Sequence, residues 1–194
     1  MTIVQAQTDS TAMLMRWSID DYHRLISSGI LAGRRVELIK GNLIEMAPEG
    51  PQHSTRTSAG SDYLREQTKG LAIVREAHPI TLSDSEPEPD IALVRGTYAT
   101  YEAHHPYPAD IFLLVEISKS TLAYDLTQKK RTYAEAGIQE YWVLDVEKHE
   151  LHVFQKPIEI RGTAEYSESR VLRQGKLQLL MLPEVSVDIS AFAS

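Results

Sequence analysis

The chain has 194 residues, of which 42% are hydrophobic, so it is long and apolar enough to form one compact domain. It contains no cysteine, which excludes a disulfide framework and a thiolate-ligated metal site. Its formal net charge of -7 at pH 7 argues against a large basic surface for non-specific nucleic-acid binding, although a local basic groove is compatible with it.

The N-terminal stretch MTIVQAQTDSTAMLMRW has no basic region followed by an apolar run, so it does not resemble a secretion signal. No later apolar run approaches the roughly 20 residues of a membrane span. We therefore expect a flexible tail over residues 1–16, a single domain over residues 17–194 and a cytoplasmic location without a membrane partner.

The first half of the domain is expected to contain a helix, a hairpin and a second helix. Ser18 is a typical N-cap, and SIDDYHRLI places acidic residues in the first helical turn. The stretch RRVELIKGNLIEMAP predicts two short strands around Lys40–Asn42, which carry a hairpin signal. From His53 to about Gln67 the chain has helical spacing, and Gly70 ends the pattern.

The second half is expected to supply most of the sheet. LAIVREA, HPITL, Ile91–Val94 and IFLLVEIS are strand-like, and the last of these is the most apolar. AYDLTQKKRTYAEAG predicts a helix ending at Gly137, and EYWVLDVEKHELHVFQ predicts a hairpin around Glu147-Lys148. Short strands near RVLR and LQLLML follow. This order indicates an α/β (α+β) domain, with a mixed central β-sheet flanked by helices and added β-hairpins.

Three carboxylates stand at positions where burial is costly. Asp90 follows Pro89 and opens a buried strand, Glu116 lies near the end of the next apolar strand, and Glu37 lies within the first hairpin. A charged carboxylate on an apolar strand requires a positive partner, and two of them on neighbouring strands repel each other. A divalent cation resolves both problems, and Mg²⁺ prefers oxygen ligands. The backbone carbonyl of Ile117 is a candidate third ligand beside Asp90 and Glu116.

A lysine near such an ion would help to activate water or to neutralise charge on a phosphate. Lys129 shares a helical face with Tyr133 and Ala136, so it could face the sheet. Lys130 lies one position off that face and is the second choice. Lys119 is nearer to Glu116 in sequence, but it is expected to begin the loop that leaves the strand.

The order of four motifs resembles one bacterial family. VELIKGNLIEM, PEPDIALV, LLVEISKST and YDLTQKKRTYAEAGIQEYWVLD follow one another as in the Uma2 family of restriction-endonuclease-like proteins, within the PD-(D/E)XK nuclease superfamily. The resemblance covers roughly Trp17 to Gln155 and weakens in the C-terminal part. It implies a restriction-endonuclease-like fold and an endonuclease that cuts DNA with Mg²⁺, for which Mn²⁺ is a substitute.

The resemblance also suggests roles for individual residues. The Pro-Asp pair that ends at Asp90 resembles the first superfamily motif, and Glu116 resembles the second acid. Glu37 resembles the acid often found on an early element. Ser118 occupies the place of the usual lysine, and members of the family resemble one another in carrying a lysine on the next helix, here Lys129. His53, Lys130 and Ser118 are further candidates for contacts with substrate or with the metal ligands.

Simpler interpretations exist for each of these residues. Asp90 could be an ordinary strand-start residue, Glu37 could face solvent, and the two adjacent lysines could lie on a solvated helix face. His53 could cap or pack against a helix. The remaining polar and aromatic residues are expected to be structural: core packing for Tyr141 and Trp142, caps or turns for Asp125 and Asp145, and loop acids for Glu86 and Glu88.

Two functions are therefore carried forward. The first is a Mg²⁺-dependent endonuclease acting on DNA, with Asp90, Glu116 and Ile117 holding the ion, Glu37 assisting and Lys129 acting on water or phosphate. The second is a catalytically silent DNA- or protein-binding module on the same fold. A homodimer is also expected, because the superfamily often pairs subunits and the apolar stretch LQLLML could pair across a dimer.

Overall fold

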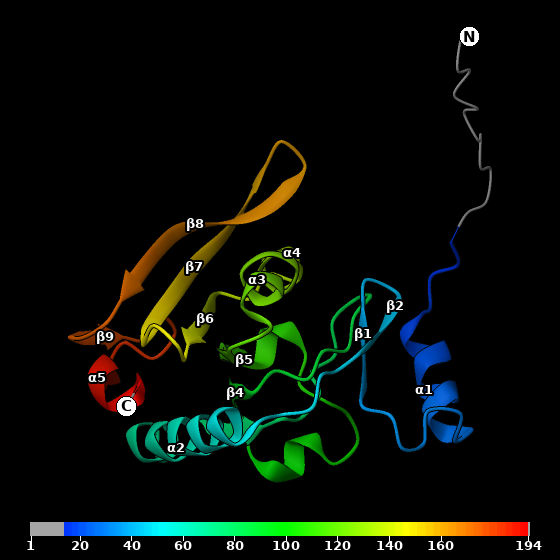
Figure 1. The fold of residues 1–194 in the computed structure, drawn as a ribbon, viewed down its shortest axis with the longest axis horizontal. Coiled ribbons are helices and arrows are strands. Elements are labelled where there is room, and N and C mark those ends of the chain that lie inside the picture. The colour runs from blue at the N-terminus through cyan, green and yellow to red at the C-terminus, as the bar shows by residue number, and fades with distance from the viewer. Residues whose placement is uncertain (1–13, 194) are drawn as a thin grey trace, which may run out of the picture.

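The computed structural model describes residues 14–193, and a six-stranded sheet forms its centre (Figure 1). The strands lie in the order β3-β4-β5-β6-β7-β8. Their bounds are Ile73–Glu76, Ile91–Val94, Ile111–Ser118, Glu140–Asp145, Glu150–Ile160 and Thr163–Leu172. The predicted mixed sheet is confirmed.

One pair of neighbouring strands in this sheet is parallel. β5 and β6 run in the same direction, with Glu116 opposite Val143, whereas the other neighbours are antiparallel. A parallel pair needs a crossover connection. Here the crossover is helical: α3 (Leu122–Tyr124), the π-helical turn η3 (Asp125–Lys129) and α4 (Lys130–Glu135). The crossover therefore carries the lysine pair back over the strand that carries Glu116.

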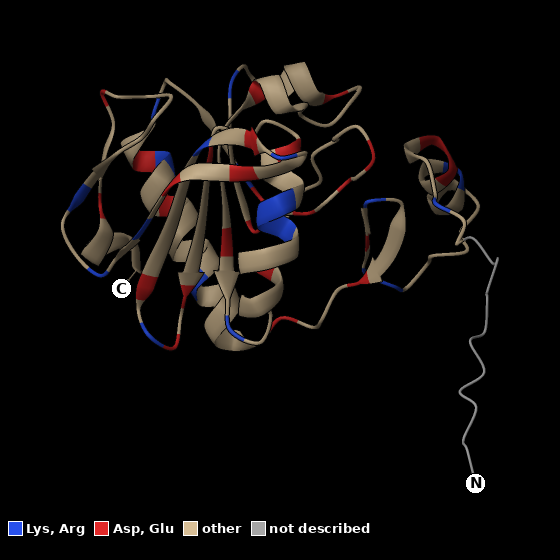
Figure 2. Cartoon of the chain, turned by 90° about the horizontal axis from the view of Figure 1, so that it is seen from above, with Lys and Arg blue, Asp and Glu red and all other residues tan. Residues whose placement is uncertain are grey.

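Helices cover both faces of the sheet (Figure 2). Leu113, Val115 and Trp142 point to the face that packs on α2 (Pro51–Gln67) and α5 (Ile189–Ala193). Leu114 and Val143 point to the opposite face, where Tyr133 and its neighbours on α4 cover them. Gly60 allows α2 to lie close, because a Cβ there would be 3.1 Å from Phe192 and 3.3 Å from Ile91. The predicted flanking helices are confirmed.

The N-terminal part consists of α1 (Ile19–Ser27) and a hairpin of β1 (Val36–Ile39) and β2 (Asn42–Glu45). Ser18 forms the expected capping box with Asp21. Lys40 and Gly41 have φ angles of 51° and 70°, as a type I′ turn requires. Leu38 and Glu86 form a bridge that attaches the hairpin to the segment before β4. This attachment brings Glu37 against the main sheet.

The C-terminal part closes over one face of the sheet. It contains the small pair β9 (Lys176–Gln178) and β10 (Ser186–Asp188), and then α5. Leu177, Leu179 and Leu182 of LQLLML are buried in the core of this chain. Those side chains are therefore not available for pairing across a dimer, and the homodimer itself stays a prediction.

Several local predictions differ from the structure. HPITL forms no strand, because its backbone bonds to loop segments: the N–H of Ile80 donates to Pro87 and that of Thr81 to Pro106. The predicted helix before Gly137 contains a π turn. Two short 3₁₀ helices, η1 (Tyr98–Tyr101) and η2 (Pro108–Asp110), occupy the loop before β5.

The predicted N-terminal tail falls mostly outside the described residues, which begin at Leu14. Leu14 and Met15 are exposed, while the N–H of Trp17 donates to the carbonyl of Gly41. Over residues 14–193, none of the helices combines the length and the apolarity that crossing a bilayer requires.

A substitution of Glu140 tests whether its hydrogen bonds attach the C-terminal part to the sheet. Its buried carboxylate accepts hydrogen bonds from Trp142 Nε1 (2.9 Å), Gln155 Nε2 (2.7 Å) and the N–H of Leu180 (2.7 Å). We expect Glu140→Ala to lower the free energy of unfolding by roughly 2–4 kcal/mol, because buried donors lose their acceptor. Urea titration followed by circular dichroism measures this. The exposed Glu159→Ala is the control, and an equal loss in both variants would contradict the assignment.

Candidate active site

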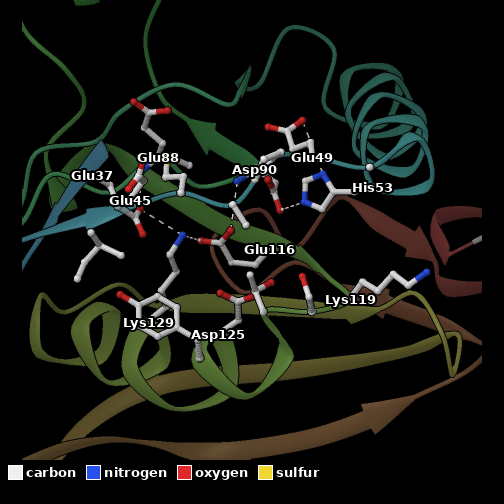
Figure 3. Close-up of a pocket in the computed structure, with 18 of the residues that line it drawn as sticks. Glu37, Glu45, Glu49, His53, Glu88, Asp90, Glu116, Lys119, Asp125 and Lys129 are labelled. Carbon is white, nitrogen blue, oxygen red and sulfur yellow. Dashed lines mark hydrogen bonds and ion pairs between the residues drawn. The ribbon is translucent and has the colours of Figure 1, made fainter. Parts of the chain in front are cut away.

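A pocket of about 620 Å³ opens at the end of β5 where Glu116 lies. Four parts of the chain surround it: the β1–β2 hairpin with the loop after it, the start of α2, the segment before β4, and the crossover after β5. Figure 3 shows the acidic side chains gathered around one lysine. The labelled residues are Glu37, Glu45, Glu49, His53, Glu88, Asp90, Glu116, Lys119, Asp125 and Lys129.

Asp90 and Glu116 meet across neighbouring strands at the inner end of the pocket. The N–H of Asp90 lies 3.4 Å from Glu116 Oε2, and the N–H of Ile117 donates to Asp90 Oδ2 at 2.6 Å. The Glu116 side chain is only 4% exposed, and that of Asp90 is 15% exposed. The two acids expected to hold an ion therefore lie together in a recessed position.

Lys129 lies between two of the buried carboxylates. Its Nζ is 3.0 Å from Glu116 Oε1 and 3.3 Å from Glu37 Oε2, and its side chain is 7% exposed. Tyr133, one helical turn later, donates its hydroxyl to the same Glu116 oxygen at 2.9 Å. Glu37 also accepts the N–H of Glu88 at 3.3 Å. The solvent-facing interpretation of Glu37 and the solvated-face interpretation of Lys129 are both wrong.

The crowding of these charges changes their protonation. Burial raises the pKa of Glu116 well above its usual value, and Lys129 opposes this while Asp90 adds to it. Burial alone would lower the pKa of Lys129, but the carboxylates of Glu116 and Glu37 raise it. These shifts favour the charged form of Lys129 and the neutral form of Glu116.

The crossover supplies a further acid that the sequence did not reveal as part of the site. Asp125 opens the π turn that ends at Lys129, and both side chains are buried. Ser118 Oγ donates to Asp125 Oδ2 at 2.6 Å. Burial raises the pKa of Asp125, and Lys129 lowers it. Because π turns occur often at functional sites, the helix irregularity itself marks this position.

His53 connects α2 to Asp90. Its Nε2 is 3.0 Å from Asp90 Oδ2, and its Nδ1 is 3.8 Å from Glu49 Oε2. The hydrogen bond to Asp90 raises the pKa of His53. His53 thus contacts a candidate metal ligand directly. It is not the cap of α2, because the N-cap is Gly50 and the helix begins at Pro51.

Two other predicted residues lie away from the pocket opening. Lys130 pairs with Glu165 of β8 at 3.1 Å and lies 5.5 Å from the Phe154 ring, so it points to the other side of the crossover. Ser118 is fully buried and contacts Asp125, so it supports the pocket from behind. Glu49, Glu88 and Lys119 also line the pocket. Glu88 was expected to be only a loop acid and Lys119 only the start of a loop, and Glu49 was not singled out from the sequence.

Known proteins resemble this chain in sequence and in fold. The Uma2 family, described as "Putative restriction endonuclease", matches residues 19–190. The chain belongs to the Uma2 family. A crystal structure from Anabaena variabilis, described as "a putative nuclease belonging to DUF820", has a TM-score of 0.71 to this protein at 16% sequence identity. The likeness covers 91% of this chain and 97% of that chain, and it shows the shared fold. None of the curated proteins matches this chain.

The oxygen-rich site fits a divalent cation, because hard ions such as Mg²⁺ bind carboxylate oxygens. Asp90 Oδ1 accepts no hydrogen bond from residues 14–193, and Glu116 Oε2 receives only the long bond from the Asp90 N–H. Both oxygens are therefore free to bind an ion. Ile117 lies beside Asp90 through its N–H, and the role of its carbonyl as a ligand stays a prediction.

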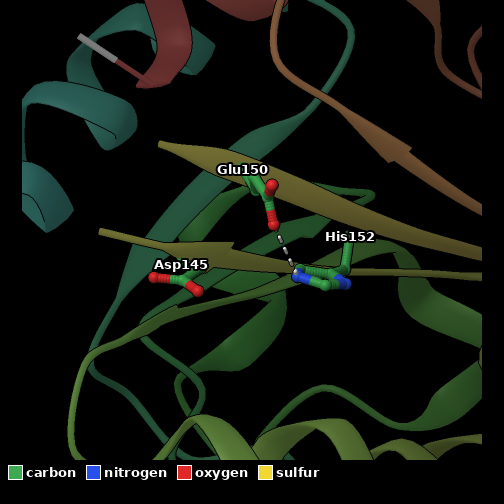
Figure 4. A group of neighbouring side chains, drawn as sticks. All are labelled: Asp145, Glu150 and His152. Atoms are coloured by element: carbon green, nitrogen blue, oxygen red, sulfur yellow. Dashed lines mark ion pairs between the residues drawn. The ribbon is translucent and has the colours of Figure 1, made fainter. Parts of the chain in front are cut away.

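A second cluster in this Uma2 protein lies on the β6–β7 hairpin (Figure 4). Asp145, Glu150 and His152 each offer an atom within 4.8 Å of the others. However, Asp145 Oδ1 accepts the N–H groups of Glu147 and Lys148 at 3.0 Å each, and Glu150 pairs with Arg173. These contacts show that the three side chains stabilise the hairpin, so we do not assign a metal site there.

Lys129 is expected to be essential for stability without metal. Lys129→Met leaves two buried carboxylates unpaired and should cost about 3–5 kcal/mol of unfolding free energy at neutral pH. Because the pKa of Glu116 is already raised, the folded variant binds more protons than the unfolded chain. The loss should therefore shrink as pH falls towards the usual carboxyl pKa. Urea titrations over a pH series, in chelator, measure this.

Lys130→Met is the matched control for that variant. Lys130 is partly exposed and makes a peripheral ion pair, so the expected loss is at most about 1 kcal/mol. Equal losses in the two variants, or a Lys129→Met loss that does not change with pH, would contradict the role assigned to Lys129.

Proposed function

We propose that this protein is a divalent-metal-dependent endonuclease that hydrolyses phosphodiester bonds of DNA, with Mg²⁺ as the ion and Mn²⁺ as a substitute. The observation that carries the proposal is the recessed pair Asp90 and Glu116, with unengaged oxygens, beside the buried ammonium of Lys129. Membership of the Uma2 family and the nuclease-like fold support it.

The residues of this chain divide the task between them. Asp90 and Glu116 would hold the ion, and Glu37 would assist through Lys129 or a water. Bound there, a divalent ion lowers the pKa of water and neutralises phosphate charge. His53 fixes the orientation of the Asp90 carboxylate through its 3.0 Å contact. Glu37, Glu116, His53 and Lys129 lie on strands and helices, and Asp90 directly precedes β4, so little reorganisation is needed.

Lys129 replaces the lysine that the superfamily carries two residues after the second acid. Its Nζ reaches Glu116 from the following helix, and its charged form is favoured. In the proposed reaction the oxygen of water bonds to phosphorus and one ester P–O bond breaks. The water proton passes to the leaving alkoxide, giving an alcohol and a phosphomonoester. Lys129 would orient the water and stabilise the charge that grows on the phosphate.

Cleavage of DNA tests the proposal. Purified protein with Mg²⁺ or Mn²⁺ should cut plasmid and oligonucleotide DNA, and chelator should abolish this. Asp90→Asn and Glu116→Gln should each lower the rate by roughly 100-fold or more, because the ion loses a ligand. Calorimetric titration with Mn²⁺ should show weaker binding in both variants.

The exposed Glu159→Gln, at a position outside the pocket, is the control and should cut DNA as the wild type does. Unchanged cleavage in Asp90→Asn would disprove the assignment of the site. Absence of cleavage together with equal metal binding in wild type and Asp90→Asn would favour the alternative, a catalytically silent DNA- or protein-binding module.

A further inference from the structure

The candidate metal ligands Asp90 and Glu116 line a small pocket and are largely buried. Its volume, about 620 Å³, lies in the range of roughly 300–1,000 Å³ that is usual for small-molecule sites. The side chains of Glu37 and Glu116 at its inner end are each 4% exposed. An oxygen of the scissile phosphate would have to reach an ion held by these side chains. The nucleotide that carries the phosphate must therefore enter the pocket.

Apolar side chains form one wall of the pocket, and most of them come from a continuous stretch of the chain that also carries Glu45 and Glu49. This wall comprises the end of β2, the loop after it and the first residue of α2, with Tyr124 contributed by the crossover. Two prolines stiffen this wall. An apolar wall with an aromatic side chain suits the face of a base, which stacks without regard to sequence. The wall residues are Ile44, Met46, Ala47, Pro48, Pro51 and Tyr124.

The charge around the pocket is unsuited to the outside of a double helix. Seven carboxylates line it against two lysines, and one of these, Lys129, is already paired. Lys119 is the other, with its Nζ 3.3 Å from Gln52 and 3.9 Å from Glu147. Duplex binding normally engages several phosphates with Lys and Arg. Figure 2 shows basic positions scattered among acidic ones along the described chain.

We propose that the pocket accepts one unpaired nucleotide, so that the substrate is single-stranded DNA, or an unpaired segment within or at the end of a duplex, rather than continuous duplex. This inference rests on the proposed nuclease function and adds the substrate class. The base lies against the apolar wall, and its phosphate reaches Asp90 and Glu116. Lys119 contacts a flanking phosphate at the pocket mouth.

A comparison of matched oligonucleotides tests this. One labelled strand is offered alone, as a blunt duplex, and as a duplex with a central unpaired bubble, with the wild-type protein and Mn²⁺. We expect the single strand and the bubble to be cut roughly 10- to 100-fold faster than the duplex, because a duplex must first unpair and unstack. Equal or faster cutting of the duplex overturns the inference and leaves the nuclease function standing.

If no cleavage occurs, measurements of DNA binding separate the proposed nuclease function from the proposed preference of the pocket for an unpaired nucleotide. Fluorescence anisotropy with the Glu116→Gln variant compares the single strand with the duplex at one salt concentration. Absence of cleavage with every substrate counts against the nuclease function alone. Tighter binding of the single strand would then still support the pocket assignment, whereas equal or tighter binding of the duplex would overturn it.

Tyr124 provides the variant test. Tyr124→Ala should raise the KM for the single strand about 5- to 100-fold through loss of stacking, and Tyr124→Phe, which keeps the ring, should change it much less. Tyr98→Ala, at an exposed position outside the pocket, is the control. Thermal unfolding checks that each variant is folded. An unchanged KM in folded Tyr124→Ala overturns the assignment of the wall.

Discussion

The ammonium of Lys129 between Glu116 and Glu37 is the interaction on which the rest of the site depends. Both carboxylates are desolvated, and each would be costly without a nearby cation. One buried positive charge cannot compensate for Glu116, Glu37, Asp90 and Asp125 together, so the site is left short of positive charge. That shortage makes a divalent ion a chemically reasonable occupant, and it also ties protein stability to the groups proposed for catalysis.

The topology explains how distant segments meet around this charge. The single parallel pair in the sheet, β5 with β6, requires a crossover, and the crossover carries Lys129 over the strand of Glu116. The β1–β2 hairpin brings Glu37 from the other side through its bridge to Glu86. The same hairpin continues into the apolar wall of the pocket. The position of the β1–β2 hairpin therefore determines both the charge of the pocket, through Glu37, and the shape of the pocket, through the apolar wall.

The sequence was sufficient to predict the elements of the fold and the site that have strong local patterns. Buried strands such as Ile111–Ser118, the hairpin turn at Lys40-Gly41 and the acids on apolar strands could all be recognised, because burial of a charge is visible as a charge within an apolar run. The burial of Glu37 was not visible, since alternation in a short strand does not reveal what packs against its outer face. Asp125 was interpreted as a cap, because a π turn has no simple sequence pattern. HPITL has strand composition, but its hydrogen bonds go to loops.

The π turn at Asp125–Lys129 sets the orientation of an acid relative to the lysine of the site. A π turn holds one residue more than the α turn that it replaces, so it is equivalent to a one-residue insertion into a helix. Removing one residue between Asp125 and Lys129 would rotate one of them by about 100° relative to the other. The lysine position thus depends on the length of the chain as well as on its composition. Relatives that gain or lose a single residue there would need their lysine elsewhere, even if every acid is kept.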